Sequence, residues 1–561
     1  MKSKLSWLFL TAALSAGQAQ AQIRIEKTFS VGADIPDRGQ YVDVRTISNT
    51  GLSAVSDVNV DLVLTSATGN VMRLGDLYAT LTHGTASEDE RVAVLLNREG
   101  ATAITPWGSS LSSINLKFDD SGDAGNVFGI ESSSGTYKAD GRLGIDPYAT
   151  ASAYDSSSVT HGLAALNGAW LASDKWSLMV ADVRQGGASR LNSWTVQMSG
   201  SAAETGTLDL GEGGKLSDVD GATNREVKAS FAVNGSGESR VTAEISNNLS
   251  LSGGLAGSGE LNKTGSGRLT LAGASADFRG KVSVNNGEVE IANGGALGST
   301  GRLELAGDGV KLTLSNAATV SNAVSLGASG SNALLDGGGV LGGDITGEGG
   351  LRKVGSGTVF LSGNASYNGA TEVAQGALSI NGSLSGNGQL SVSSGATLKG
   401  SGMVNVSTEI AGIHAAGNSP GLQTFSAGLS YGSSSSLDWE FMGNSLGLRG
   451  TDYDGIDVTG GNLAIASGAT LRMLAGAGVD YSDLAWSSSR SFSVIQFTGG
   501  GSSSGNFILD ATSAGSSSGY GSWALASNSG DVTLNWTAVP EPSSVAILGG
   551  LALLGLARRR R

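Results

Sequence analysis

Short runs of alternating hydrophobic and polar residues fill the first part of the chain. Clear examples are DVNVDLVL (57–64), KWSLMVAD (175–182) and SWTVQMS (193–199). A period of two is typical of strands with one buried face, and the Gly, Asn and Asp residues between the runs favour turns. The pattern over residues 22–200 therefore predicts an all-β fold, a β-sandwich or jelly roll.

The next region repeats itself. The segment GSGELNKTGSGRLTLAG (257–273) aligns with GEGGLRKVGSGTVFLSG (347–363), and residues 278–291 align with 367–380. Repeats of this kind predict a solenoid. We expect a right-handed parallel β-helix, in which small aliphatic residues stack inward while Gly and Asn occupy the corners. A disordered Gly/Ser linker is the alternative, and the regular Leu/Val/Ile alternation argues against it.

The N-terminus carries an apolar run behind two basic residues. Two lysines precede the apolar segment 5–14, and Ala19 and Ala21 form a small-x-small cleavage site. This pattern is typical of a secretory signal peptide. We expect signal peptidase to cut after Ala21, so that the mature chain begins near Gln22 and leaves the cytoplasm.

The C-terminus carries a weaker apolar run, 545–557, of about 13 residues with three glycines. A bilayer crossing needs about 20 apolar residues, so the run predicts a short hydrophobic helix that anchors the chain only transiently. The basic residues after it would stay on the cytoplasmic side; they are Arg558, Arg559, Arg560 and Arg561. A buried C-terminal helix is the alternative, but it would place these four charges at its end.

Composition narrows the class of protein. Among 561 residues there are 88 glycines and no cysteine, and the formal net charge is −14. An acidic surface repels nucleic acid and anionic lipid and suits a secreted protein exposed to calcium. Without cysteine, the exported domains depend on burial and hydrogen bonding rather than disulfides. No phosphate-binding glycine motif or zinc-type spacing stands out.

Tryptophan content divides the chain near residue 200. Trp107, Trp170, Trp176 and Trp194 lie before it, where we expect the last three to form sandwich core, and residues 201–424 hold none. The predicted organisation is a signal peptide at 1–21, the sandwich at 22–200, the β-helix at 201–425, a Ser/Gly-rich β region at 426–538 and a C-terminal signal at 539–561.

The N-terminal motifs also follow a known order. DIPDRG (34–39), LGDLYATLTHG (74–84), LKFDD (116–120), SGTYKADG (134–141) and RLNSWTVQM (190–198) succeed one another. This series resembles the P domain, or P/Homo B domain, of kexin- and furin-type proprotein convertases. The resemblance implies a domain that stabilises a serine endopeptidase and carries a calcium site. Only about a dozen residues separate the signal peptide from the first motif, so we expect no catalytic domain in this chain.

The loop FDDSGDAGN (118–126) is the candidate calcium site. It offers Asp119, Asp120 and Asp123, with Asn126 beside them. Calcium takes six to eight oxygen ligands, which clustered carboxylates and backbone carbonyls supply. The alternative is a solvated turn in which Asp side chains bond to the backbone.

Histidine is sparse, at His83, His161 and His414. No pattern sets a histidine beside a nucleophile, so we expect surface or structural roles and no catalytic residue.

Two further resemblances concern export. The C-terminus resembles the PEP-CTERM sorting signal of Gram-negative bacteria: Val539-Pro540-Glu541-Pro542 is followed by the short apolar run and then by the arginines. This resemblance implies cleavage by exosortase. The two prolines keep the motif extended for recognition. The repeats, with L-x-K-x-G-S-G in each, resemble the autotransporter-associated β-strand repeat of secreted passenger domains, and so does the later segment 415–441.

Together these observations predict an exported, non-enzymatic protein of the cell surface or extracellular matrix, associated with biofilm or exopolysaccharide. Two alternatives stay open. One is a P-domain protein that works with a separately encoded serine endopeptidase, and the other is a carbohydrate-binding β-helix. The last rests on fold analogy alone.

Overall fold

The computed structural model describes residues 21–539, apart from 48–49, 86–87, 102–106, 121–124, 129, 131, 144–158, 169–174, 220–224, 316, 446 and 529–530. The chain divides into two compact units. The first unit is Met1–Leu261 with Gly267–Leu269, and the second is Asn262–Ser266 with Thr270–Arg561.

The first unit begins with two β-sheets. One sheet pairs strands in the order β1-β11-β3-β8-β9, with bounds β1 (Gln22–Ile35), β11 (Ser189–Ala202), β3 (Leu52–Ser66), β8 (Ser113–Phe118) and β9 (Ser134–Tyr137). The other follows β2-β10-β5-β6, with bounds β2 (Gln40–Thr46), β10 (Lys175–Asp182), β5 (Leu77–Thr85) and β6 (Glu88–Asn97). The connections of this region also hold a two-stranded sheet of β4 (Met72–Arg73) and β7 (Ser110–Leu111), and the 3₁₀ turns η1 (Leu74–Asp76) and η3 (Leu163–Leu166).

The hydrophobic residues of the alternating runs fill the space between these sheets. Trp176 on β10 and Trp194 on β11 are fully buried. The Nε1–H of Trp194 donates to Oδ2 of Asp43 on β2, at 2.8 Å, so that a hydrogen bond joins the two sheets inside the core. The predicted β-sandwich and the core positions of these two tryptophans are confirmed, whereas Trp170 lies outside the described residues.

Parallel strands follow the sandwich within the same unit. Their bounds are β12 (Thr207–Asp209), β13 (Lys215–Asp218), β14 (Glu226–Val227), β15 (Ser230–Ala232), β16 (Val241–Glu244), β17 (Asn248–Leu251) and β18 (Leu255–Ala256), with η4 (Gly237–Ser239) before β16. Three parallel stacks form, β12-β15-β18, β13-β16 and β14-β17.

β1 of the sandwich pairs antiparallel with β13, which sets Ile25 opposite Leu216. This pairing joins the sandwich and the first solenoid strands within the first compact unit, which extends to Leu261. Strands β19 (Glu260–Thr264) and β20 (Arg268–Leu271) carry residues of both units.

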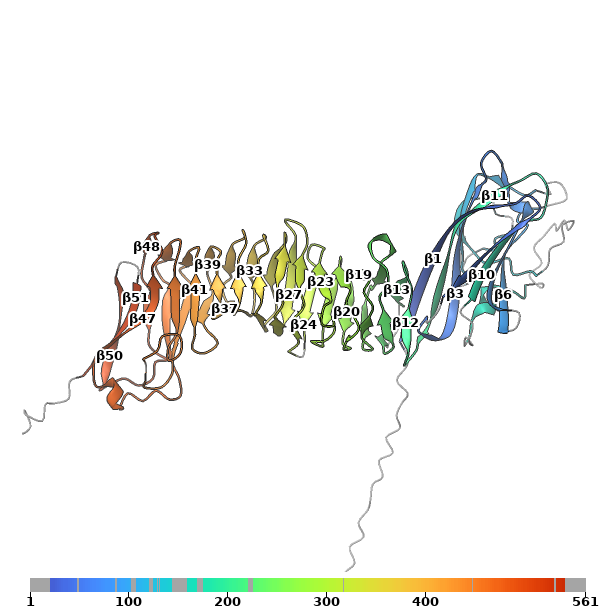
Figure 1. The fold of residues 1–561 in the computed structure, drawn as a ribbon. Coiled ribbons are helices and arrows are strands. Elements are labelled where there is room, and N and C mark those ends of the chain that lie inside the picture. The colour runs from blue at the N-terminus through green and yellow to red at the C-terminus, as the bar shows by residue number, and fades with distance from the viewer. Residues whose placement is uncertain are drawn as a thin grey trace, which may run out of the picture. The chain divides into compact units, whose positions relative to one another are not determined.

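The second unit is a parallel β-solenoid (Figure 1). Its strands stack in three columns. The first column contains β21 (Lys281–Val284), β23 (Arg302–Leu305), β26 (Val324–Leu326), β29 (Ile345–Gly347), β32 (Asn364–Ala365), β35 (Ser383–Leu384), β38 (Met403–Val404), β41 (Leu422–Phe425), β44 (Gly455–Val458) and β47 (Arg490–Phe497). The second contains β22 (Glu288–Ile291), β24 (Lys311–Leu314), β27 (Asn332–Gly337), β30 (Gly350–Lys353), β33 (Thr371–Val373), β36 (Leu390–Val392), β39 (Thr408–Ile410), β42 (Leu429–Tyr431), β45 (Leu463–Ile465) and β48 (Ser503–Ser504).

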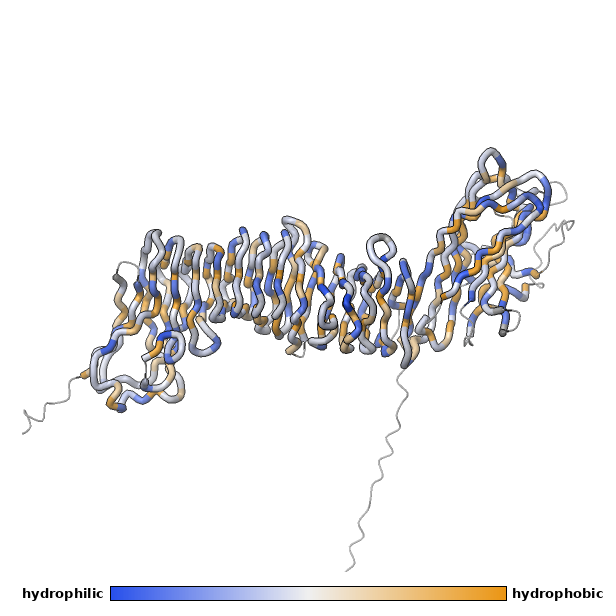
Figure 2. Tube along the Cα trace, in the orientation of Figure 1, coloured by the Kyte–Doolittle hydropathy of each residue, from blue (hydrophilic) through white to orange (hydrophobic). Residues whose placement is uncertain are grey.

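The third column has nine strands among the described residues. They are β25 (Thr319–Val320), β28 (Gly339–Leu341), β31 (Thr358–Leu361), β34 (Ala377–Ile380), β37 (Thr397–Gly400), β40 (Ile413–Ala416), β43 (Ser436–Phe441), β46 (Thr470–Ala475) and β49 (Ile508–Asp510). Figure 2 shows hydrophobic and hydrophilic positions alternating along these strands. The predicted all-β fold with a parallel solenoid is confirmed.

An antiparallel hairpin ends the described chain. β51 (Asp531–Ala538) pairs with β50 (Gly521–Asn528) on one side and with β47 on the other. Beside it, η5 (Leu484–Trp486) brings Trp486 into an aromatic cluster with Trp523 and Trp536. No helix in the described part of the chain is long and apolar enough to cross a membrane. The predicted C-terminal helix lies outside the described residues.

Candidate functional site

The described chain stops where the predicted sorting signal starts. β51 ends at Ala538, and the N–H of the half-exposed Val539 donates to the carbonyl of Tyr520 at 2.8 Å. The sorting residues themselves lie outside the described residues; they are Pro540, Glu541, Pro542, Arg558, Arg559, Arg560 and Arg561. The last described strand, β51, therefore ends directly before the predicted signal at 539–561.

The predicted N-terminal cleavage site lies at the start of the sandwich. Gln22 is the first residue of β1, and its Nε2 donates to Oγ of Ser201 at 2.8 Å. Ala21 is buried, and its carbonyl accepts the N–H of Ala202 at 2.7 Å. Ala19 lies outside the described residues. A chain that begins at Gln22 keeps the whole of β1.

The predicted calcium loop is only partly described, because Asp123 lies in the segment 121–124. Oδ2 of Asp120 accepts the N–H of Ala164 at 3.1 Å, so this carboxylate caps the short turn η3. The Nζ of Lys117 lies 3.9 Å from Oδ2 of Asp119. Across the described parts of the chain, no three acidic or histidine side chains are close enough to hold a metal ion. Calcium at this loop stays a prediction, while Asp120 has the backbone-bonding role of the alternative.

The three histidines have separate surroundings. The ring of His83 packs on Trp176, with ring centroids 4.8 Å apart, and Nδ1 of His161 lies 2.7 Å from Oγ1 of Thr160. His414 is fully buried in the solenoid, where Nδ1 meets the hydroxyl of Tyr431 at 2.7 Å and Nε2 meets Oε1 of Gln423 at 2.8 Å. Burial lowers the pKa of His414 to about 4, so the ring is neutral near pH 7.

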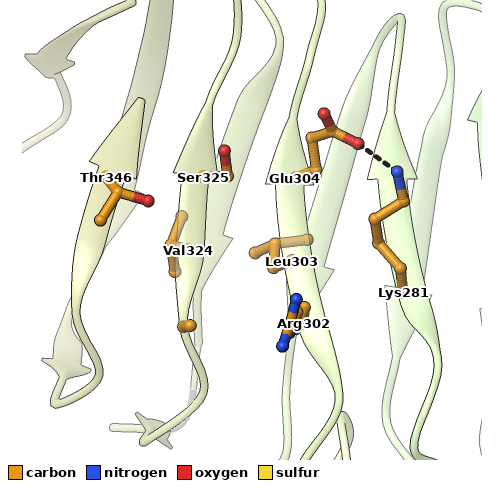
Figure 3. Close-up of a pocket in the computed structure, with 8 residues that line it drawn as sticks. Lys281, Arg302, Leu303, Glu304, Val324, Ser325 and Thr346 are labelled. Atoms are coloured by element: carbon orange, nitrogen blue, oxygen red, sulfur yellow. Dashed lines mark hydrogen bonds and ion pairs between the residues drawn. The ribbon is translucent and has the colours of Figure 1, made fainter. Parts of the chain in front are cut away.

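A polar hollow of about 380 Å³ lies on the first column of the solenoid (Figure 3). Leu303 and Val324 form its buried floor. Outward side chains from four neighbouring strands surround it; they are Lys281, Arg302, Glu304, Ser325 and Thr346. The Nζ of Lys281 pairs with Oε2 of Glu304 at 2.7 Å.

The chemistry of this hollow suits a hydroxyl-rich ligand. Ammonium, guanidinium and hydroxyl groups donate hydrogen bonds, and the carboxylate of Glu304 accepts them. No aromatic side chain lines the hollow among the described residues, so a sugar ring would find no stacking surface there. The sequence pattern predicted polar outward positions, but it could not show which strands would combine them into one hollow.

Comparison with protein families matches two parts of the chain. The passenger-associated-transport-repeat model matches residues 261–291 and 351–380, the same two segments that align with each other. The PEP-CTERM protein-sorting motif matches residues 538–561. No curated protein matches the chain. The comparisons give no support to a P/Homo B domain in residues 22–200, so that resemblance and the endopeptidase association it implies stay predictions.

These matches confirm the resemblance of the C-terminus to the sorting signal and that of the two repeats to the passenger repeat, while the resemblance of segment 415–441 stays a prediction. The chain carries the sorting motif of exported, exosortase-processed proteins of the Gram-negative envelope, joined to repeats found in transported passengers.

Proposed function

We propose that this exported protein is a structural or adhesive component of the cell surface or of the exopolysaccharide matrix. The observation that carries the proposal is the PEP-CTERM motif at 538–561, which begins on the last residue of β51. Exosortase would remove this tail during export. The described strands of the sandwich and of the solenoid would all stay in the processed chain.

The stacking of strands in the solenoid supports a structural role. Each strand pairs with the equivalent strand of the next turn, and buried leucine, valine and isoleucine side chains stack along the columns. Such an array presents many similar polar outward rows and needs no catalytic centre. Exopolysaccharide would bind through rows such as the one around Glu304, by many weak hydrogen bonds.

Localisation in the producing bacterium tests the sorting step. We expect the double substitution Pro540→Ala and Pro542→Ala to hold the chain at the inner membrane and to deplete it from the matrix fraction. The matched control is Ser543→Ala with Ser544→Ala, which leaves the motif prolines in place. Equal amounts of the proline variant and the wild type in the matrix would contradict sorting through this motif.

A deletion strain tests the role itself. We expect loss of matrix retention or surface attachment, restored by the wild-type gene and not by the proline variant. A deletion strain with unchanged attachment and unchanged exopolysaccharide retention would contradict the structural or adhesive role, even if sorting is correct.

A further inference from the structure

A second polar hollow, of about 320 Å³, lies on the third column of the solenoid. Ala415 on β40 lies opposite Lys399 of β37 on one side and opposite Asp438 of β43 on the other. Neighbouring strands lie about 4.8 Å apart, so the backbones of Lys399 and Asp438 stand roughly 10 Å apart across this alanine. A single methyl group between two longer side chains leaves the surface open, and we call this opening the Ala415 hollow.

Opposite charges face the Ala415 hollow from its two sides. Lys399 lines it from β37, and Glu440 lines it from β43. Both side chains are half-buried. Among the described residues, neither the ammonium of Lys399 nor the carboxylate of Glu440 has an ion pair or a hydrogen bond. Both charged groups are therefore available to a ligand.

A buried carboxylate also lines the hollow. Asp454, the residue before β44, is only 3% exposed. Its Oδ1 accepts the N–H of Gly421 at 2.7 Å, and its Oδ2 accepts the N–H of Glu440 at 2.8 Å. A carboxylate can accept about four hydrogen bonds, so these two fix the group and leave positions for the donors of a ligand.

The negative charge beside Glu440 is not neutralised by the arginines of this region. Arg472 pairs with Asp438, and Arg449 pairs with Asp457. Burial raises the pKa of Asp454 to about 7, and the charged side chains that raise it further are both carboxylates. The hollow therefore favours a ligand that brings a positive charge to this side.

A fixed turn supplies neutral hydrogen-bonding groups at the rim. Asn418 and Ser419 both line the hollow. The hydroxyl of Ser379 donates to Oδ1 of Asn418 at 3.1 Å, and Nδ2 of Asn418 donates to Oδ1 of Asn381 at 2.9 Å. Ser419 has a φ of 98°, which residues with a side chain rarely adopt, and strain of this kind is concentrated where loops hold ligands. The turn thus presents an oriented amide and a hydroxyl to the hollow.

We propose that the Ala415 hollow binds an amino sugar, a sugar residue with a free ammonium group, within the matrix polysaccharide. The ammonium would lie against Glu440 and Asp454, which accept its hydrogen bonds. The hydroxyl groups of the sugar would meet Lys399, Asn418 and Ser419 on the other walls. The net charge of the chain, −14, would also attract a polymer that carries positive charge. This inference rests on the proposed function, because it takes exopolysaccharide as the partner.

Calorimetric titration of the full exported chain with two matched oligosaccharides tests the inference. One is an oligomer of glucosamine, and the other is the same oligomer with every amine acetylated. Near neutral pH we expect the glucosamine oligomer to bind about tenfold more tightly, because it alone offers a charged donor to the carboxylates. Equal affinities for the two oligomers would overturn the inference.

Variants locate the binding. Glu440→Gln keeps the shape of the side chain and removes its charge, so it should lose most of the preference for the glucosamine oligomer. Ala415→Leu should weaken the binding of both oligomers, because its side chain would fill the hollow. The matched control is Glu409→Gln on β39, an exposed glutamate of the second column that makes the same change in net charge and should keep the full preference.

Two results with these variants would contradict the site. A preference that survives in Glu440→Gln would place the binding elsewhere on the chain. An equal loss in Glu409→Gln and Glu440→Gln would show that net charge, and not the hollow, attracts the oligomer.

The deletion strain separates this inference from the proposed function. A protein whose loss releases exopolysaccharide, but which does not distinguish the two oligomers, would overturn the amino-sugar site and leave the structural or adhesive role standing. A protein that prefers the glucosamine oligomer through Glu440, in a strain that needs it neither for attachment nor for exopolysaccharide retention, would keep the site and overturn the role.

Discussion

Two buried lysines in the repeats donate hydrogen bonds to backbone carbonyls, a role that the local sequence does not predict. Lys263 and Lys353 are buried at equivalent positions of the two matched repeats. The Nζ of Lys353 donates to the carbonyls of Val354, Gly355 and Gln375, at 2.5, 3.0 and 3.5 Å. The ammonium group thus donates hydrogen bonds to backbone carbonyls where the chain turns after the strand, and one of these carbonyls, that of Gln375, belongs to the next turn of the solenoid.

Replacing this lysine should weaken the solenoid. We expect Lys353→Met to lower the free energy of unfolding by about 1–3 kcal/mol, because three partly buried carbonyls lose a charged donor. Lys281→Met on the outer face removes a partly exposed ion pair with Glu304 and should cost at most about 1 kcal/mol. Urea unfolding of both variants checks this, and equal losses would show that the Lys353 bonds contribute no more than a surface pair.

His414 gives the solenoid a calculable dependence on pH. Its folded pKa of about 4 lies below the unfolded value of 6.5, and Asp438 and Tyr431 are the titratable groups that act on it or contact it. The unfolded chain binds the extra proton between these values, so stability is complete above pH 6.5 and falls towards pH 4.

The full loss from this group is about 3 kcal/mol. We expect His414→Gln to remove that part of the difference in unfolding free energy between pH 7 and pH 4, measured against the wild type. An identical pH dependence in the two proteins would mean that His414 accepts a proton inside the fold.

At the scale of the strand and its turn, glycines set how closely the solenoid turns can stack. A Cβ on Gly357 would lie 2.2 Å from the carbonyl oxygen of Gly337, and one on Gly376 would lie 2.6 Å from that of Gly357. Those distances are shorter than any real Cβ contact, so the backbones approach only because side chains are absent.

Gly357→Ala should therefore force the turns apart. We expect a loss of about 1–3 kcal/mol in the free energy of unfolding, the usual cost of overpacking a tight contact. Gly342→Ala is the matched control, since its Cβ would meet nothing nearer than 3.7 Å and its backbone is not left-handed. Chemical denaturation distinguishes them, and a neutral Gly357→Ala would mean that the turns separate without cost.

The last hairpin covers one end of the first column. β51 pairs antiparallel with β47, so no further parallel strand can add there. Trp536 is fully buried on this hairpin, and its Nε1–H donates to the carbonyl of Trp486 at 2.9 Å. The hairpin is held by aromatic packing, which the small aliphatic layers of the repeats lack.

Removing that aromatic anchor should release the hairpin. We expect Trp536→Ala to cost about 3–5 kcal/mol and to expose the edge of β47, so that the chain aggregates. Tyr520→Ala, half-exposed at the start of the same hairpin, should change little. Light scattering and denaturation of the two variants check this, and a monomeric, stable Trp536→Ala would show that the cap is dispensable.

Periodicity explains which of these elements the sequence could predict. Alternating Leu and Val residues predicted the strands, and the aligned repeats predicted their stacking, because both depend on neighbours in sequence or on a fixed period. The partners of Lys353 and the Ala415 hollow depend on segments brought together by folding. No local pattern tells that Lys399, Glu440 and Asp454 line one hollow.

At the scale of the whole molecule, the two predicted processing sites lie just outside the described strands. β1 begins at Gln22 and β51 ends at Ala538, so cleavage near both points would leave every described strand intact. The sorting motif matches residues 538–561, which agrees with a tail that is used during export and then removed.

Intact-mass measurement of the chain recovered from the cell surface tests this arrangement. We expect an N-terminus at or near Gln22 and the absence of Arg558 to Arg561, because a tail with four arginines would keep the C-terminus on the cytoplasmic side of the inner membrane. The control is the Pro540→Ala, Pro542→Ala variant, which should lose the N-terminal segment and keep the arginines, since signal peptidase acts at the other end. Surface-exposed wild-type chain that still carries the arginines would mean that the motif is not a removable sorting signal in this protein.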